Sequence, residues 1–308
     1  MRVMWRCGRS LTQARAVACA GVLAVAAPAG TAEAQQAPFI FSQEQFKTGQ
    51  SIAPSFDGWI ANPDGSFSMV FGYFSRNWEE QSDVPIGPNN TIEPGGPDRG
   101  QPTHFFPRRN KFVFQVRVPK DFGNKELIWT LTVNGKTETA YATLKPDYVL
   151  EKQIIQTTAS MLLGISEFAK NEWPVVEFEG ATQRAVKVGE PLSLSATVTD
   201  DGLPKSRPAA RNAAVNDTTA VGLRVAWFVY RGPSDKVTFD PPQFKVYPDK
   251  NIGGNSPWTV GWAPPPLPPN GKFPVNVTFN APGTYVLRVM AHDGGLDNTK
   301  DVTVTVTP

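Results

Sequence analysis

Carboxylates, arginines and a histidine occur together in the segment 84–109, whose sequence is VPIGPNNTIEPGGPDRGQPTHFFPRR. Together with the acidic residues just upstream, they are Glu79, Glu80, Asp83, Glu93, Asp98, Arg99, His104, Arg108 and Arg109. Two carboxylates on either side of a sugar are the machinery of glycoside hydrolysis. His104 with Asp98 or Glu93 would instead supply some of the ligands of a metal ion.

Neither chemistry is specific to this pattern. Surface loops commonly carry carboxylates, and one histidine with a carboxylate matches no recognised metal-ligand spacing. Stiff Pro- and Gly-rich chain with arginines and aromatic residues is more typical of an interface. We therefore expect a binding surface without a metal, and its expected binding residues are Glu93, Asp98, Arg99 and His104. The structural alternative is that this segment wraps the sheet and caps its open edge, fixed by Arg–carboxylate pairs.

A second candidate binding surface lies in the segment 241–272. It contains Trp258 and Trp262, followed by the sequence PPPLPP at 264–269, which favours a polyproline II conformation. Exposed tryptophans beside a stiff segment would suit contact with a protein or a glycan. The alternative is that both tryptophans fold back as a lid on one end of the domain.

Sequence motifs of common enzyme classes are missing. The chain has no Gly-x-Ser-x-Gly, no His-Glu-x-x-His, no phosphate loop and no dinucleotide fingerprint. Its two histidines, His104 and His292, fall in different predicted domains. We therefore predict a protein that is not an enzyme, with no catalytic residue and no cofactor.

The N-terminus predicts export. Four arginines precede the apolar run 16–29, and Ala32-Glu33-Ala34 is a small-x-small cleavage site. This order is typical of a secretory signal peptide over 1–34, and the run is too short for the alternative, a membrane anchor. Both cysteines, Cys7 and Cys19, fall in the removed segment, so the mature protein has no disulfide. We expect a periplasmic or secreted protein without a membrane span.

The charge excludes a global electrostatic attraction to nucleic acid. The formal net charge is +2, but four of the 30 basic residues and one of the 28 acidic residues precede residue 35. The mature chain therefore has 26 basic and 27 acidic residues. A near-neutral protein of this kind gives no reason to expect nucleic-acid binding.

Alternating apolar and polar residues predict an all-β protein with two antiparallel β-sandwich domains, over 38–150 and 174–308. In the first domain, alternation predicts strands at 67–73, 112–118, 127–133 and 137–144. Asn134-Gly135 predicts a two-residue type I′ hairpin between the last two. The segment 84–109 shows neither strand nor helix pattern.

The second domain has about seven short strands at the spacing of an immunoglobulin-like sandwich. The predicted strands are 175–178, 192–199, 223–230, 237–239, 275–279, 285–291 and 302–306. Trp227 is its candidate buried tryptophan, and Tyr285, after a Pro-Gly turn, is a candidate tyrosine corner. Between the domains, 151–173 is expected to be a linker. We predict a strand over 148–156 before helical character, with a connecting helix as the alternative.

The second domain resembles a bacterial PKD domain in three blocks. They are Val188-Gly189-Glu190 through Asp200-Asp201-Gly202, the strand around Trp227, and APGTYVLRVMAHDGG at 281–295. This resemblance implies an extracellular, non-catalytic spacer or contact module. The chain departs from the family at Arg231-Gly232-Pro233, and it carries two long insertions. The first domain resembles uncharacterised secreted bacterial proteins, which implies no function.

Aspartates at the ends of strands in the second domain are candidate ligands of a calcium ion. If the loops after two of the strands share one end of the sandwich, acidic side chains could meet there and bind calcium. Those residues are Asp200, Asp201, Asp293 and Asp297. The alternative is that each makes the local hydrogen bonds usual for a turn aspartate.

We expect an exported, non-catalytic binding or structural module of the bacterial cell envelope that contacts protein or carbohydrate. The alternative is a carboxylate-dependent hydrolase acting on carbohydrate through the 79–104 region.

Overall fold

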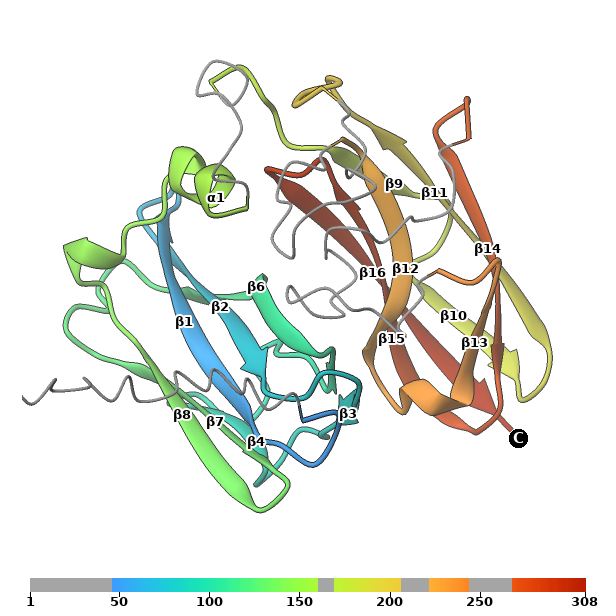
Figure 1. The fold of residues 1–308 in the computed structure, drawn as a ribbon, viewed down its shortest axis with the longest axis horizontal. Helices are drawn as coiled ribbons and strands as arrows, with labels where there is room; N and C mark the ends of the chain where they lie inside the picture. Colours follow the sequence, from blue (N-terminus) through green and yellow to red (C-terminus); the bar gives the residue numbers. More distant parts are fainter. Residues whose placement is uncertain (1–45, 160–168, 206–221, 244–267) are drawn as a thin grey trace, which may run out of the picture. The chain divides into compact units, whose positions relative to one another are not determined.

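The computed structural model describes residues 46–159, 169–205, 222–243 and 268–308. The predicted signal peptide, Trp258 and Trp262 lie outside the described residues. Within those ranges, the regular structure is almost entirely β-structure and forms two sandwiches, whose strand pairs are antiparallel except for β10 with β16 (Figure 1). The predicted all-β class is therefore confirmed.

Two three-stranded sheets and one small two-stranded sheet form the first sandwich. The first sheet has the order β1 (Ile52–Ala61), β2 (Phe67–Ser75) and β6 (Arg108–Val118). The second has the order β4 (Asn90–Glu93), β7 (Leu127–Val133) and β8 (Lys136–Ala142). The small sheet pairs β3 (Ser82–Asp83) with β5 (His104–Phe105).

Aromatic rings from the two three-stranded sheets form the first core. The fully buried Trp129 on β7 meets Phe71 on β2 and Phe114 on β6 edge to face, with ring centroids 6.0 and 5.0 Å away. Edge-to-face and offset-stacked contacts are the favoured geometries of aromatic pairs. Alternation in the sequence placed these rings on one face of each strand, so the sheets must pack here.

The β7–β8 hairpin is confirmed in register and turn. Val133 pairs with Lys136, and the two residues between them, Asn134 and Gly135, have φ angles of 49° and 76°. Positive φ at both positions is what a type I′ turn requires. The prediction of a segment 84–109 without strands was wrong, because β4 pairs with β7 and β5 pairs with β3.

The second sandwich has the strand order of an immunoglobulin-like fold. One sheet has the order β9 (Val175–Phe178), β11 (Pro191–Thr199), β14 (Lys272–Phe279) and β13 (Val237–Asp240). The other has the order β10 (Gln183–Lys187), β16 (Asp297–Thr307), β15 (Gly283–His292) and β12 (Arg224–Arg231). In immunoglobulin nomenclature these are A-B-E-D and A′-G-F-C, which matches the constant-type arrangement with one extra edge strand.

Two side chains complete this pattern. Trp227 on β12 is 1% exposed and contacts the Phe178 ring with a centroid distance of 6.0 Å. Tyr285 is fully buried against Phe279, and its hydroxyl donates to the carbonyl of Ala281 at 3.0 Å. The buried tryptophan and the tyrosine corner predicted from the sequence are both confirmed.

The chain between the sandwiches differs from the prediction. Pro146–Tyr148 is a 3₁₀ turn, and α1 (Lys152–Ala159) is an α-helix, so the predicted strand over 148–156 was wrong. Only Leu150 donates a strand-like bond, to Trp59 O at 2.8 Å. Ile155 is buried while Ile154 and Gln153 are exposed, which is helical rather than alternating burial.

The described residues belong to one compact unit, Glu44–Pro308, and the first buried apolar cluster includes Phe228, Tyr230 and Met290 from the second sandwich. The domain boundaries at 150 and 174 therefore stay a prediction. No helix among the described residues combines the length and apolar character that a bilayer span needs.

The tyrosine corner makes a testable contribution to stability. Tyr285→Phe removes one hydrogen bond from a buried ring without removing the ring, so we expect unfolding free energy to fall by about 1 kcal/mol. Urea unfolding would measure this, with Tyr141→Phe on an exposed tyrosine as the control. Equal stability of the Tyr285 variant and the wild type would show that the corner contributes nothing.

Candidate functional site

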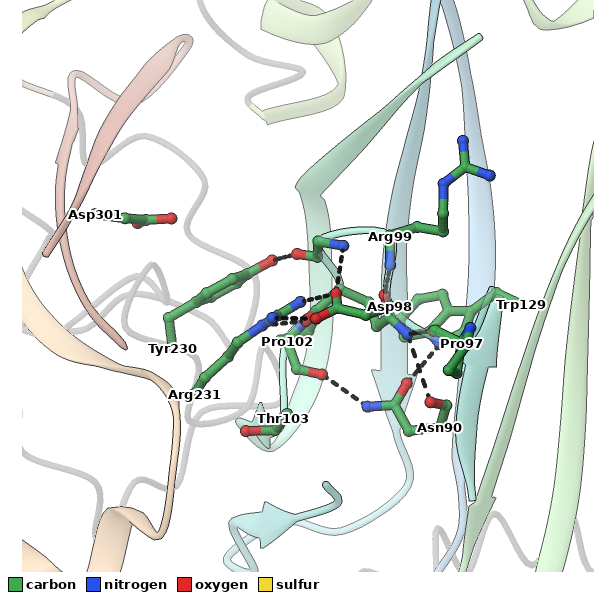
Figure 2. A network of polar contacts seen from close by, with 12 residues as sticks. Asn90, Pro97, Asp98, Arg99, Pro102, Thr103, Trp129, Tyr230, Arg231 and Asp301 are labelled. Carbon is green, nitrogen blue, oxygen red and sulfur yellow. Dashed lines mark hydrogen bonds and ion pairs between the residues drawn. The ribbon is translucent and has the colours of Figure 1, made fainter. Parts of the chain in front are cut away.

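A buried asparagine orders the segment 84–109. Asn90 is fully buried, and its Nδ2 donates to Val84 O at 3.0 Å and Pro102 O at 2.8 Å. Its Oδ1 accepts a bond of 3.0 Å from the indole nitrogen of Trp129 (Figure 2). One side chain thus ties both ends of the segment to the core of the first sandwich.

The segment then binds the second sandwich through Asp98 and Arg231, which lie side by side in Figure 2. The Arg231 guanidinium donates two hydrogen bonds to the carboxylate, from Nη1 to Asp98 Oδ2 at 3.0 Å and from Nη2 to Asp98 Oδ1 at 2.8 Å. Its Nε donates to Gln101 O at 2.8 Å. The bonds from Arg231 hold the pKa of Asp98 below its usual value. Such a bidentate pair fixes orientation as well as contributing energy.

Backbone contacts extend this junction along β12. Thr103 N donates to Tyr230 O at 3.1 Å, and Gly232 N donates to Thr103 Oγ1 at 3.0 Å. The Tyr230 hydroxyl donates to Gly100 O at 2.5 Å. Because β12 is the edge strand of its sheet, the segment covers an edge that would otherwise expose unpaired backbone groups.

His104 is part of the same junction. It is 3% exposed, with Nδ1 2.8 Å from Asp83 Oδ1 and Nε2 2.9 Å from Gln81 Oε1. Asp83 Oδ2 accepts a bond of 3.0 Å from Ser234 N of the second sandwich. Both ring nitrogens therefore have protein partners, which leaves His104 a positioning role in the described structure.

The other predicted residues of this segment lie apart from the junction. Glu93 is exposed, and its Oε2 accepts a long bond of 3.4 Å from Gly96 N. Arg99 donates to Pro94 O at 2.7 Å and to Arg117 O at 3.4 Å. The structure thus brings Asp98 and His104 to one junction and leaves Glu93 and Arg99 beside their own turn. Their binding roles stay predictions.

The upstream carboxylates have local partners too. Glu79 lies 3.1 Å from Lys47 Nζ, and Glu80 Oε2 accepts a bond of 2.6 Å from Gly49 N. Each carboxylate proposed for a hydrolase at 79–104 is therefore bonded to a cation or to backbone N–H groups. None of these bonds sets up a pair of carboxylates across an open site.

Sequence reasoning missed Arg288 on β15. Its Nε and Nη2 donate to Asp301 at 2.7 and 2.8 Å, and its Nη1 donates to Val113 O of β6 at 2.8 Å. The guanidinium carbon also lies 3.5 Å from the centroid of the Tyr230 ring. A single arginine within the apolar run TYVLRVMAH was the sequence signal for this bridge.

Acidic and amide side chains meet at one end of the second sandwich. Asp293 is fully buried, and its Oδ1 accepts from Gly295 N and Leu296 N while its Oδ2 accepts from Asn171 Nδ2 at 3.0 Å. Burial raises the pKa of Asp293 to about 6, and the nearby Asp200 adds to this rise. Asp200 therefore lies close enough to Asp293 to interact with it electrostatically, and a shared calcium site stays a prediction.

Those aspartates make the local turn bonds of the alternative interpretation. Besides Asp293, Asp200 Oδ2 accepts from Gly202 N at 3.0 Å and Asp201 Oδ1 accepts from Leu203 N at 2.8 Å. Across the described ranges, no group of three or more His, Cys, Asp or Glu side chains is placed to hold a metal ion.

Comparison with solved structures gives matches of low sequence identity. No protein-family model and no curated protein matches the chain. Titin domain M7 is 10% identical over 45% of this chain and 97% of that chain, with a TM-score of 0.23. Domains 4 and 5 of the S-layer protein SbsC are 11% identical over 60% of this chain and 66% of that chain, also with a TM-score of 0.23. A conjugative transposon lipoprotein from Bacteroides eggerthii is 12% identical over 42% of this chain and 95% of that chain, with a TM-score of 0.24.

TM-scores this low carry no argument about the whole chain. The immunoglobulin-like class of the second sandwich rests instead on its strand order, its buried tryptophan and its tyrosine corner.

A double-mutant cycle tests the junction. We expect Arg231→Met and Asp98→Asn to lower unfolding free energy and to show a coupling of about 1 kcal/mol, because the pair is bidentate but half-exposed. The more exposed pair Arg117–Asp64 is the control and should show a smaller coupling. Additive effects of the two junction variants would contradict the assignment.

Stability should depend on the ionisation of Asp293. Its folded pKa of about 6 lies above the ordinary value of 3.8, so the folded state keeps a proton that the unfolded state loses. Unfolding free energy therefore falls as pH rises from about 4 to about 6, by about 3 kcal/mol for this group. Asp293→Asn should reduce the fall in urea titrations by this amount and leave the part that the raised pKa of Asp297 contributes, whereas Asp121→Asn on an exposed aspartate should keep the whole fall. Parallel pH profiles of wild type and Asp293→Asn would contradict the assignment.

Proposed function

We propose that the mature chain is an exported, non-catalytic binding or structural module of the bacterial cell envelope. The observation that carries the proposal is the junction of Asp98 with Arg231. The segment 84–109 of the first sandwich uses the Asp98 carboxylate, the Thr103 hydroxyl and backbone groups to bind the second sandwich. A segment used in this way supports a protein that presents two sandwiches as one unit.

The proposed organisation is a signal peptide over 1–34, a sandwich over 38–150, a connection over 151–173 and a PKD-like domain over 174–308. The immunoglobulin-like strand order and the tyrosine corner support the last assignment. The resemblance to PKD domains implies spacing and contact with protein or carbohydrate. The arginine-rich leader and the cysteine-free mature chain support export.

We favour this function over the hydrolase. A glycoside hydrolase needs one carboxylic acid with a raised pKa and a second carboxylate across the substrate. In the 79–104 region, the pKa of Asp98 is lowered by Arg231, and Glu79 and Glu80 are bonded to Lys47 and Gly49. A general acid needs surroundings that favour its protonated form, whereas a bonded cation or N–H group favours the ionised carboxylate.

Purified protein starting at Gln35 would test the proposal by two measurements. We expect no turnover of a panel of aryl glycosides, and small-angle scattering that fits one rigid particle. The matched variant Arg231→Ala should broaden the distance distribution, while Arg117→Ala on the exposed pair should not. Turnover that disappears in Glu93→Gln or Asp98→Asn would overturn the non-catalytic proposal. Independent motion of the two sandwiches in the wild type would overturn the proposal that they form one rigid unit.

A further inference from the structure

An open cleft lies between the edge of β6 and the sheet that contains β12, β15 and β16. Its volume is about 290 Å³, at the lower end of the range of small-molecule sites. The residues that line it on the β6 side are Asn110, Lys111, Phe112, Val113, Phe114 and Gln115. The opposite side is formed by Phe228, Tyr230, Arg288, Met290 and the start of β16.

An irregularity in β6 shapes one wall of this cleft. Phe71 pairs with Phe114 and Tyr73 pairs with Asn110, so three residues of β6 stand opposite Gly72 alone. Phe112 in this bulge has a φ of 55°, a region that a bulky residue rarely adopts. Bulges and strained backbone are common beside binding sites, where they redirect side chains.

Buried contacts maintain the bulge. Asp57 Oδ2 accepts a bond of 2.8 Å from Phe112 N, and Asp57 Oδ1 lies 2.5 Å from Arg109 Nη2. The Asp57 side chain is 4% exposed. A Cβ at Gly72 would lie 2.4 Å from both Asn110 O and Asp57 Oδ2, so only glycine fits there. The sequence therefore supports this wall with a buried carboxylate, its partly buried arginine partner and an obligatory glycine.

The base of the cleft is aromatic and already ordered. Phe106 and Phe228 are buried in an edge-to-face contact with a centroid distance of 5.5 Å. Arg288 stacks on Tyr230, and its charge is neutralised by Asp301. These rings are each 7% exposed or less, so they hold the base rigid, and a ligand would meet mainly the polar groups of the cleft without having to pair with this arginine.

The rim combines donors and acceptors without a dominant charge. Lys111 and Gln115 lie on the β6 side, and Asp297, Asn298 and Thr299 lie on the β16 side. Burial, with a contribution from Arg109, lowers the pKa of Lys111. Burial raises the pKa of Asp297 to about 7. Lys111 and Asp297 are opposite in charge when both are ionised, so the rim suits a neutral, hydrogen-bonding ligand better than an ionic one.

We propose that this cleft binds a neutral mono- or disaccharide, whose hydroxyl groups bond to the polar side chains of the rim, Asp297, Gln115 and Thr299. Carboxylate, amide and hydroxyl groups together supply both donors and acceptors, which is what a polyol requires. The inference rests on the proposed binding function and assigns a ligand class and a site to it.

Amide chemical shifts of ¹⁵N-labelled protein starting at Gln35 would test the inference. The probes are glucose, galactose, mannose, N-acetylglucosamine, cellobiose, lactose and chitobiose at millimolar concentrations. We expect at least one to shift amides of 110–115 and 297–299 saturably. Gln115→Trp should abolish these shifts by filling the cleft, and Asp297→Asn should weaken binding about tenfold. Gln183→Trp on β10 and Asp121→Asn are matched exposed controls that should leave binding unchanged.

The outcomes separate the inference from the proposed function. No shift of the cleft amides with any saccharide, or equal binding by wild type and Gln115→Trp, overturns the saccharide cleft and leaves the non-catalytic module intact. Saturation of the cleft by free amino acids or dipeptides in place of sugars overturns the ligand class. Cleavage of cellobiose, lactose or chitobiose in the same samples would overturn the non-catalytic function itself.

Discussion

The hydrogen bonds of the buried Asn90 side chain are the constraint on which the arrangement of this protein depends. An asparagine amide without partners inside a protein costs free energy, so its position is defined by the groups that satisfy it. Here these groups are the Val84 and Pro102 carbonyls and the Trp129 indole. These bonds anchor the chain at Val84 and Pro102, and the adjoining residues Asp98 and Thr103 contact the end of the edge strand of the neighbouring sandwich.

The strands that the sequence predicted are those in which alternation and turn chemistry act locally. β7 and β8 follow from alternating apolar residues around Asn134-Gly135, because this dipeptide adopts the positive φ angles of the turn without help from the rest of the chain. The tyrosine corner was equally accessible, since Tyr285 and Ala281 are four residues apart. Local patterns of this kind do not depend on knowing which elements become neighbours.

The features that the sequence did not predict depend on contacts between distant residues. Asp98 and Arg231 are 133 positions apart, and neither has a local pattern that names the other. The bulge at Phe112 is maintained by Asp57, 55 positions away. The first part of α1 was predicted as the end of a strand, with a connecting helix as the alternative, because its few apolar residues fit both periodicities over so short a run; burial decides for the helix. The candidate cleft combines these distant contacts, which is why the sequence pointed to the charged segment and not to the cleft.

The position of β16 in its sheet has a mechanical consequence. This strand is paired on both sides, in parallel with β10 from Gln183 to Lys187 and antiparallel with β15 from Asp297 to Val306. A pulling force along β16 is therefore parallel to both neighbouring strands, β10 and β15. Under such a force β16 can separate from the sheet only by sliding along these strands. The interstrand bonds of the two ladders would then have to break together rather than one after another, so the second sandwich is built to resist pulling at this strand more strongly than at an edge.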